Sequence, residues 1–170
     1  AILALLVKRF RKEWPDVKII FRGDSGFCRW KMLRWCEKNN VKYIIGISSN
    51  SRLAKITSHI AAKSRKKFNR TGKKSKLYTT TYYAAKTWDK KRKVIVKAEH
   101  TSMGKNLRYV VTNIADDPRY LYEKIYCARG DMENRIKEQK LDLFADRTSC
   151  HGWWANQFRP LLASLAYILI

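Results

Sequence analysis

The sequence predicts an α/β fold that joins a parallel strand–helix–strand unit to a block of antiparallel strands. Two short apolar runs, residues 17–21 and 41–47, flank a helical pattern. Together they cover about 30 residues, which is the size of a right-handed parallel crossover. From residue 77 onward the apolar pattern changes to a period of two, which is typical of antiparallel strands.

The first elements lead to a lone acid. A helical stripe over residues 2–10 ends before Pro15, and residues 17–21 (VKIIF) have the β-branched content of a buried strand. Asp24 stands between glycines directly after that strand. Open α/β sheets place active-site groups at this position. The alternative is a turn aspartate that binds its own backbone.

The crossover continues with a helix over residues 27–37 and a second buried strand over residues 41–47. Asn50 is expected to cap the helix that follows. The side chains expected to face the core from these two helices are Trp30, Leu33, Cys36, Leu53, Ile56 and Ile60.

Residues 63–76 (KSRKKFNRTGKKSK) are basic and nearly free of aliphatic side chains. This composition predicts a solvated loop that lies along phosphates, with a merely solubilising surface as the alternative. Three strands of a meander follow at residues 77–88, 93–100 and 107–114, with turns near Asp89 and Gly104.

The central stretch of the chain contains Tyr126, Arg129, Glu133 and Lys140 at spacings of three, four and seven. On one continuous helix these side chains lie within about 60° of one another. One carboxylate among cations suits a metal ligand whose neighbours contact phosphates. The alternatives are a surface ion pair between Arg129 and Glu133, or a helix that begins later with Asp131 as its N-cap.

Two apolar stripes are predicted to be buried at the end of the chain. Met132, Ile136 and Leu143 give the central helix a core side at spacings of four and seven. Residues 153–170 are nearly continuously apolar, so they predict a buried closing helix that Pro160 would kink.

The charge of the chain indicates a polyanionic partner. Lys and Arg number 37 against 14 Asp and Glu among 170 residues, a net charge of +23. Nucleic acid is the usual partner of so basic a domain. A membrane surface is the weaker alternative, because no basic amphipathic helix with a separate apolar face is found, and residues 161–170 are too few to span a bilayer. The four cysteines show no CxxC spacing, and we expect them to be reduced thiols of a cytoplasmic protein.

The pattern Tyr-x2-Arg-x3-Glu-x6-Lys resembles the signature of DDE transposases of bacterial insertion sequences. The segments around Asp24 (RGDSGF, YIIGISSNSRL) and after Lys140 (LDLFADRTSCHGWWANQFR) are also similar in sequence to that family. The resemblance implies an RNase H-like core carrying a β-rich insertion. It implies three segments: residues 1–62 for part of the core, 63–115 for the basic loop and insertion, and 116–170 for the C-terminal helices.

The resemblance also implies roles for single residues. Asp24 and Glu133 would be the second and third acids of a site that holds two Mg²⁺ or Mn²⁺ ions. Arg129 and Lys140 would contact phosphates of the transposon end, supported by Tyr126. Lys137 lies near the same face of the predicted helix and is a further candidate for DNA binding.

The first acid of the family is not found in this chain. The only aspartate before Asp24 is Asp16, which does not lie on a predicted strand. The sequence also begins with Ala and not with Met, and its first residues already belong to the helical pattern. We therefore interpret the chain as a fragment that lacks the first three strands of the core, and we expect the fragment alone to be inactive.

The function implied is Mg-dependent nicking and strand transfer of DNA by a bacterial, nucleoid-associated enzyme. Its partners would be transposon ends and target DNA, bound by a homodimer on paired ends. One alternative is a non-catalytic DNA-binding remnant of a decayed element. Another is an RNase H-like nuclease acting on RNA hybrids, which would not need the cations at positions 129 and 140.

Overall fold

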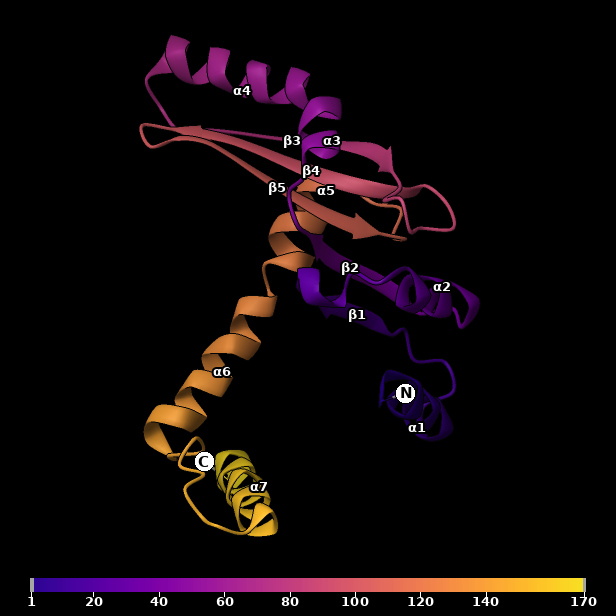
Figure 1. Cartoon of the computed structure of the whole chain (residues 1–170), viewed down its shortest axis with the longest axis vertical. Coiled ribbons are helices and arrows are strands. Elements are labelled where there is room, and N and C mark those ends of the chain that lie inside the picture. The colour runs from indigo at the N-terminus through magenta and orange to yellow at the C-terminus, as the bar shows by residue number, and fades with distance from the viewer. Residues whose placement is uncertain (1, 170) are drawn as a thin grey trace. The chain divides into compact units, whose positions relative to one another are not determined.

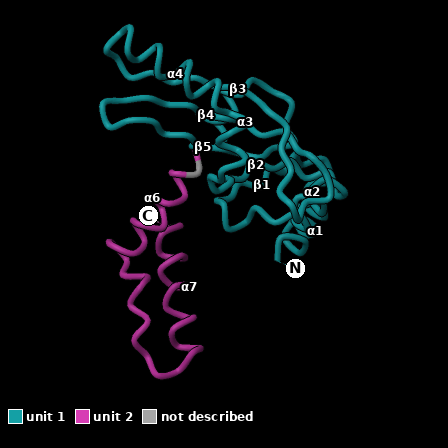
Figure 2. Tube along the Cα trace, turned by 45° about the horizontal axis from the view of Figure 1, so that its top comes forward, with its two compact units in different colours: residues 1–127 teal, residues 128–170 magenta. Residues whose placement is uncertain are grey.

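The computed structural model describes residues 2–169, with the backbone but not the side chain of Arg129. It divides into two compact units, residues 1–127 and residues 128–170 (Figure 2). Whether the chain also divides by role into segments 1–62, 63–115 and 116–170 stays a prediction.

Unit 1 is built on one mixed five-stranded sheet with the strand order β1-β2-β5-β4-β3 (Figure 1). The strands are β1 Ile20–Gly23, β2 Lys42–Ile47, β3 Ser75–Tyr83, β4 Arg92–Thr101 and β5 Gly104–Thr112. The helices of this unit are α1 Ile2–Glu13, the short 3₁₀ helix η1 Ser25–Phe27, α2 Trp30–Lys38, α3 Ser51–Ile56, α4 Ser58–Thr71, α5 Pro118–Tyr120 and the π-helix η2 Leu121–Tyr126. The predicted α/β class is therefore confirmed.

The crossover and the meander are both present and belong to the same sheet. β1 and β2 are parallel and are joined through α2. β3, β4 and β5 are antiparallel neighbours, as predicted. β5 also pairs antiparallel with β2, from Ile44 opposite Thr112 to Ile47 opposite Tyr109. The meander thus extends the sheet of the crossover and does not form a sheet of its own.

Alternation along the strands gives the sheet two apolar faces. Tyr43 and Ile45 of β2 belong to the larger core cluster, which also contains Leu33 of α2 and Leu53 of α3. Ile44 belongs to the second cluster. The other members of the second cluster are Ile95, Val110, Leu121 and Tyr122. Because the last two are residues of η2, the π-helix covers the face opposite α2 and α3.

Several predicted boundaries shift. The buried strand expected at residues 17–21 is wrong in both place and burial, because β1 begins at Ile20, which is 44% exposed. Among the strands of residues 2–169, β1 lies at the edge of the sheet and pairs with β2 alone. The helix expected from residue 27 begins at Trp30, after η1, and its Leu33 and Cys36 are buried as predicted. Asn50 caps α3 as predicted, since its Oδ1 accepts from the amide of Leu53 at 2.9 Å.

The loop expected at residues 63–76 is wrong. Most of that stretch belongs to α4, which ends at Thr71 with Gly72 as a left-handed C-cap at φ +64°. Lys and Arg are good helix formers, so a basic composition does not oppose a helix. Ile60 and Ser64 supply the buried side of this helix.

Unit 2 consists of α6 Arg129–Asp142 and α7 Trp153–Leu169. Arg135 of α6 donates to Tyr167 of α7 at 3.0 Å, and Tyr167 donates to Glu138. These contacts hold the two helices of this unit together. α7 continues through Pro160, and Ser164 Oγ donates to the carbonyl of that proline.

The predicted burial of both apolar stripes in unit 2 is wrong. Met132 and Ile136 are exposed on α6, and Ala163 is the buried residue among those described on α7. Trp154 is 79% exposed. The composition of a helix indicates which face can be buried, but burial needs a partner surface of matching shape. None of the described helices is long and apolar enough to cross a membrane.

Candidate functional site

Asp24 lies where the sequence predicted it, directly after the carboxyl end of β1. It is the N-cap of η1, and its Oδ1 accepts from the amide of Gly26 at 2.9 Å. The turn-aspartate interpretation therefore describes its local backbone correctly. The same side chain is exposed. A carboxylate has several lone-pair sites, so capping the turn does not prevent it from binding a further group.

Tyr126, the last residue of η2, lies close to the Asp24 turn although about 100 residues separate them in the sequence. An ideal Cβ on Gly46 would stand 2.7 Å from the Tyr126 hydroxyl, 3.4 Å from the amide nitrogen of Ser25 and 3.6 Å from the carbonyl carbon of Asp24. The space beside Gly46 is therefore shared by the phenol and the turn. Two of the predicted site residues, Asp24 and Tyr126, are thus brought together by the structure.

The position of Tyr126 depends on η2. The amide of Cys127 donates to the carbonyl of Tyr122 at 3.0 Å, an i→i−5 bond that closes the π-helical turn. Arg22 of β1 donates from Nη1 to the carbonyl of Ile125 at 3.2 Å, which ties η2 to the strand that precedes Asp24. π-helical turns are rare and often occur at functional sites.

Aromatic packing supports the same arrangement. The ring of Tyr122 lies 5.5 Å from that of Tyr126 and 5.7 Å from that of Tyr78. Burial raises the pKa of Tyr122 to about 12. The Tyr122 hydroxyl therefore stays protonated at neutral pH, and its role is to pack η2 against the sheet.

Gly46 and Arg22 are site residues that no motif of the sequence predicted. A glycine inside a β-branched strand often marks a close approach of other atoms, and Gly46 in YIIGI gave that signal. Nothing in the pattern around Arg22 predicted its bond to Ile125, because that bond joins residues 103 positions apart.

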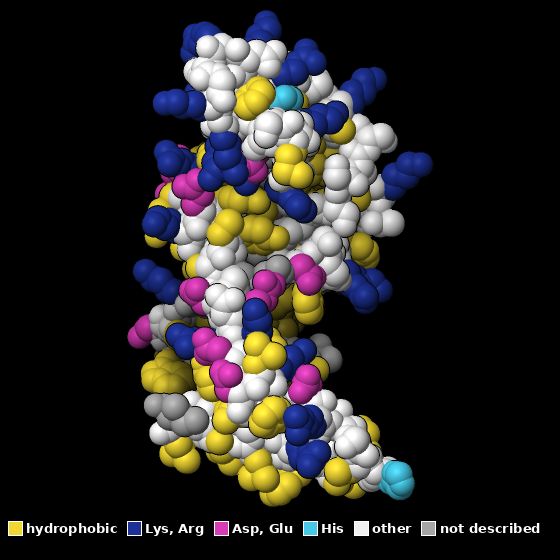
Figure 3. Space-filling view, turned by 90° about the vertical axis from the view of Figure 1, so that its left-hand side faces the viewer, with side chains coloured by type: hydrophobic (Ala, Val, Ile, Leu, Met, Phe, Trp, Pro, Cys, Tyr) yellow, Lys and Arg dark blue, Asp and Glu magenta, His cyan; other side chains and the backbone are white. Residues whose placement is uncertain are grey.

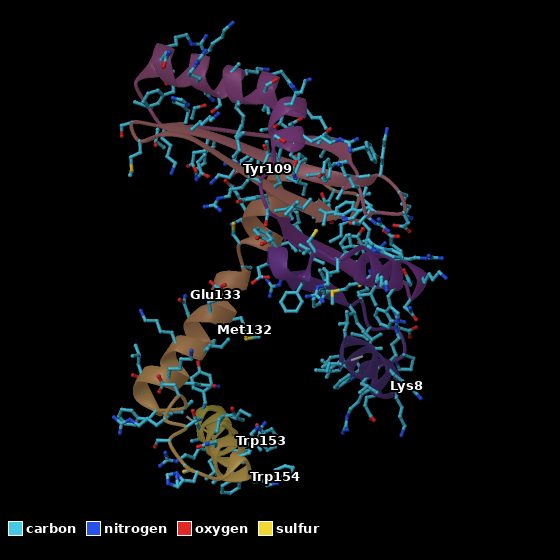
Figure 4. All side chains as sticks on the ribbon, in the orientation of Figure 1. Lys8, Tyr109, Met132, Glu133, Trp153 and Trp154 are labelled. Carbon is cyan, nitrogen blue, oxygen red and sulfur yellow. The ribbon has the colours of Figure 1, made fainter. Side chains whose placement is uncertain are left out.

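The remaining predicted residues belong to α6. Glu133, Lys137 and Lys140 are exposed, and spacings of four and seven place them on one side of the helix. Figure 4 shows Glu133 and Met132 projecting from different sides of α6. The side chain of Arg129 lies outside the described residues, so its predicted ion pair with Glu133 stays a prediction.

The helix boundary corrects the expectation of one continuous face. α6 begins at Arg129 with Ala128 as its N-cap, so the alternative N-cap at Asp131 is wrong. Tyr126 lies on η2 and not on α6, because the chain leaves regular helical geometry between the two elements. The shared face therefore applies to residues of α6 and does not extend to Tyr126.

The carboxylates of Asp24 and Glu133 are exposed oxygen donors, the type that Mg²⁺ and Mn²⁺ prefer. Their chemistry fits such an ion. Within residues 2–169 as described, no three His, Cys, Asp or Glu side chains form a group that could hold a metal. Asp24 belongs to unit 1 and Glu133 to unit 2, so their convergence stays a prediction.

Cys28 and Cys36 are free thiols. Cys28 follows η1, and burial raises the pKa of its thiol to about 11, as it does for Cys36.

Comparison with known proteins places the chain in a family. A family model described as "Transposase DDE domain group 1" matches residues 1–170. No curated protein and no solved structure matches the chain.

Proposed function

The chain belongs to the family of DDE transposase domains, and from this membership we propose that it acts in cutting and joining DNA strands during transposition of an insertion sequence. The observation that carries the proposal is the placement of Asp24 at the carboxyl end of β1, beside the hydroxyl of Tyr126. An exposed carboxylate at the carboxyl end of a strand occupies the position where open α/β sheets place active-site groups, and the Tyr126 phenol lies beside the turn that carries it.

The acids and the cations have separate roles in this proposal. Asp24 and Glu133 hold Mg²⁺ or Mn²⁺, which when bound stabilises charge on the oxygens of an in-line phosphoryl displacement. Arg129, Lys137 and Lys140 contact phosphates of the transposon end. Tyr126 positions the Asp24 turn through the space beside Gly46.

We further propose that unit 1 contains part of an RNase H-like core. The parallel β1–α2–β2 crossover, with an acid after its first strand, supports this assignment. Asp16 is the only aspartate before Asp24 in the sequence, and it is exposed and precedes β1. The first acid of the family is therefore expected from residues that this chain does not contain, and the chain alone is expected to be inactive. Two copies are expected to act on paired ends.

Strand transfer by the longer parent protein tests the assignment of the acids. Asp24→Asn and Glu133→Gln should each abolish nicking and strand transfer of transposon-end DNA, while binding of the same DNA is kept. The matched controls are Asp16→Asn and Asp142→Asn, which remove exposed acids from unit 1 and from α6. The controls should keep both activities.

The main rival is a DNA-binding remnant without catalysis, which the net charge of +23 would serve equally well. A remnant predicts that the parent protein binds DNA and never cuts it, with any metal ion. Robust cleavage by this 170-residue chain would contradict the proposed incompleteness of its site. Preferential cutting of an RNA hybrid would favour a nuclease instead.

A further inference from the structure

A row of cations lies along one flank of α4. Its members are Lys63, Lys66, Lys67 and Arg70. Lys66 and Lys67 are neighbours, and the other spacings of three, four and seven keep all four within about 100° of the helix surface, over a length of about 10 Å. α4 contains no Asp or Glu, so no acid of the helix itself neutralises the row. We call these four residues the α4 basic row.

The helix that carries the row is fixed to the sheet. Ile60 is buried, and Ser64 Oγ donates to the carbonyl of Ala98 at 3.3 Å and to Ser75 Oγ at 3.2 Å. The ring of Phe68 lies 5.1 Å from that of His100 on β4. These contacts lie on the inner side of α4. The row is therefore held on a rigid element, so little conformational entropy of the backbone is lost when a ligand binds.

The row borders a shallow hollow of about 260 Å³ between α4 and β3, where Leu77 completes the lining. A second hollow of about 390 Å³ shares Lys67 with the first. The other residues that line it are Lys74, Lys76, Tyr78, Arg119 and Glu123. Through Lys67 the positive surface continues from the helix onto the start of β3.

The acids near this surface are already paired with cations. Glu99 binds Lys74 at 2.6 Å and Lys97 at 2.9 Å, and Glu123 binds Arg119 at 3.1 Å. Figure 3 shows Lys and Arg side chains around the top of the molecule on the face drawn there. These acids therefore do not neutralise the α4 basic row, which keeps an excess of positive charge.

We propose that the α4 basic row and the start of β3 bind the phosphate backbone of duplex DNA, on elements other than those that carry the Asp24 turn. This inference rests on the proposed function, which supplies DNA as the substrate. A duplex carries one charge per about 1.7 Å of its axis, so the row can face several phosphates at once. Lys side chains on a helix flank, without base-reading geometry, provide affinity and position independent of sequence.

A lipid surface fits the row less well. Interfacial helices pair a basic face with a large apolar face that enters the bilayer. The apolar side of α4 is occupied by the sheet, through Ile60 and Phe68. Leu77 is the apolar residue in the hollow beside the row and is only half-buried.

The test compares two sets of four charge removals in this chain. The row variant combines Lys63→Gln, Lys66→Gln, Lys67→Gln and Arg70→Gln. Gln has nearly the helix propensity of Lys, so α4 should remain helical by circular dichroism. The matched control combines Lys8→Gln, Arg9→Gln, Lys12→Gln and Lys38→Gln, which are exposed cations of α1 and α2. Both variants have the same net charge.

Binding of a short DNA duplex is measured by fluorescence anisotropy from about 50 to 200 mM salt. The row variant should lose at least about tenfold in affinity, and its slope of log K against log salt should fall in magnitude by about 3. The control should change the slope by less than about 1. Equal losses in the two variants would overturn the proposed surface and assign binding to net charge alone.

Two other outcomes distinguish a failure of the proposed function from a failure of the proposed DNA-binding surface. If the wild-type chain binds no DNA, the DNA substrate of the proposed function fails, and the surface fails with it. If the row variant keeps DNA binding but loses binding to vesicles that contain phosphatidylserine, the row serves a membrane and the proposal is overturned.

Discussion

The Tyr126 hydroxyl occupies the space that a side chain at position 46 would need. An ideal Cβ there would meet it at 2.7 Å, closer than real Cβ contacts allow. Gly46 lies inside β2, where glycine weakens a strand by comparison with a β-branched residue. The glycine is therefore explained by the close approach of η2 to the Asp24 turn and not by a turn of its own.

We predict that Gly46→Ala destabilises the protein by about 1–3 kcal/mol, because the new methyl displaces the phenol. In a Tyr126→Phe background the same substitution should cost clearly less, since the atom that it meets is gone. The free energy of unfolding of the four proteins, measured with urea, gives the coupling between the two positions.

Gly130→Ala is the matched control for this cycle. No heavy atom lies within 4 Å of an ideal Cβ at that position, and the residue is helical. Ala should be neutral or slightly stabilising there. A cost of Gly46→Ala that is the same with Tyr126 and with Phe at position 126 would show that the hydroxyl is not the obstacle.

This residue-scale feature also shows how far the sequence predicts the site. Asp24 was placed correctly because an acid after a strand has a fixed position relative to that strand. Tyr126 was assigned to the same site only through the family resemblance. Its contact with Gly46 depends on the packing of η2 against β2, which no local pattern encodes.

Among the elements, α4 shows why charge does not decide secondary structure. The sequence predicted a loop from the lack of aliphatic residues between positions 63 and 76. The buried side of α4 needs only Ile60, Ser64 and the ring of Phe68, because a nearby sheet accepts them. The remaining positions are free to carry the basic row.

The tip of the meander is stabilised by a carboxylate between two lysines. Glu99 of β4 is 5% exposed and binds Lys74 and Lys97. The ion pair with Lys74, helped by Lys97, lowers the pKa of Glu99 from 4.5 to about 2. A carboxyl whose pKa is lowered by folding contributes stability above its ordinary pKa and loses it as the pH falls.

We predict that Glu99→Gln makes unfolding less sensitive to acid between about pH 5 and pH 2. At neutral pH the variant should be less stable by about 1–2 kcal/mol, toward the low end because Lys74 is more than half exposed. As the pH falls the difference should narrow, since the wild-type carboxylate becomes protonated. Urea unfolding at a series of pH values measures this difference directly.

The control is Glu13→Gln, which removes an exposed carboxylate from α1. It should follow the wild-type acid profile. If Glu99→Gln also follows that profile, the ion pairs at the meander tip contribute nothing to the pH dependence of folding.

At the scale of the whole molecule, the sequence predicted the order of elements better than their burial. The parallel crossover and the meander follow from local periodicity. The pairing of β5 with β2, which joins them into one sheet, is a contact between distant segments and was not predicted. In unit 2 the sequence predicted that the apolar faces of α6 and α7 are buried, yet Met132 and Trp154 are exposed.

Asp24 belongs to unit 1 and Glu133 to unit 2. If Asp24 and Glu133 share one divalent ion, each contributes to the same binding event. Asp24→Asn and Glu133→Gln should then each remove most of the Mn²⁺ affinity of the chain, and the double variant should lose little more than either single one.

Binding is measured by isothermal titration calorimetry, with Asp16→Asn as the control that keeps the affinity. Residues without a shared partner give effects that add within about 0.5 kcal/mol. Additive losses would therefore place the two carboxylates at separate ions, and unchanged affinity in the double variant would remove both from metal binding.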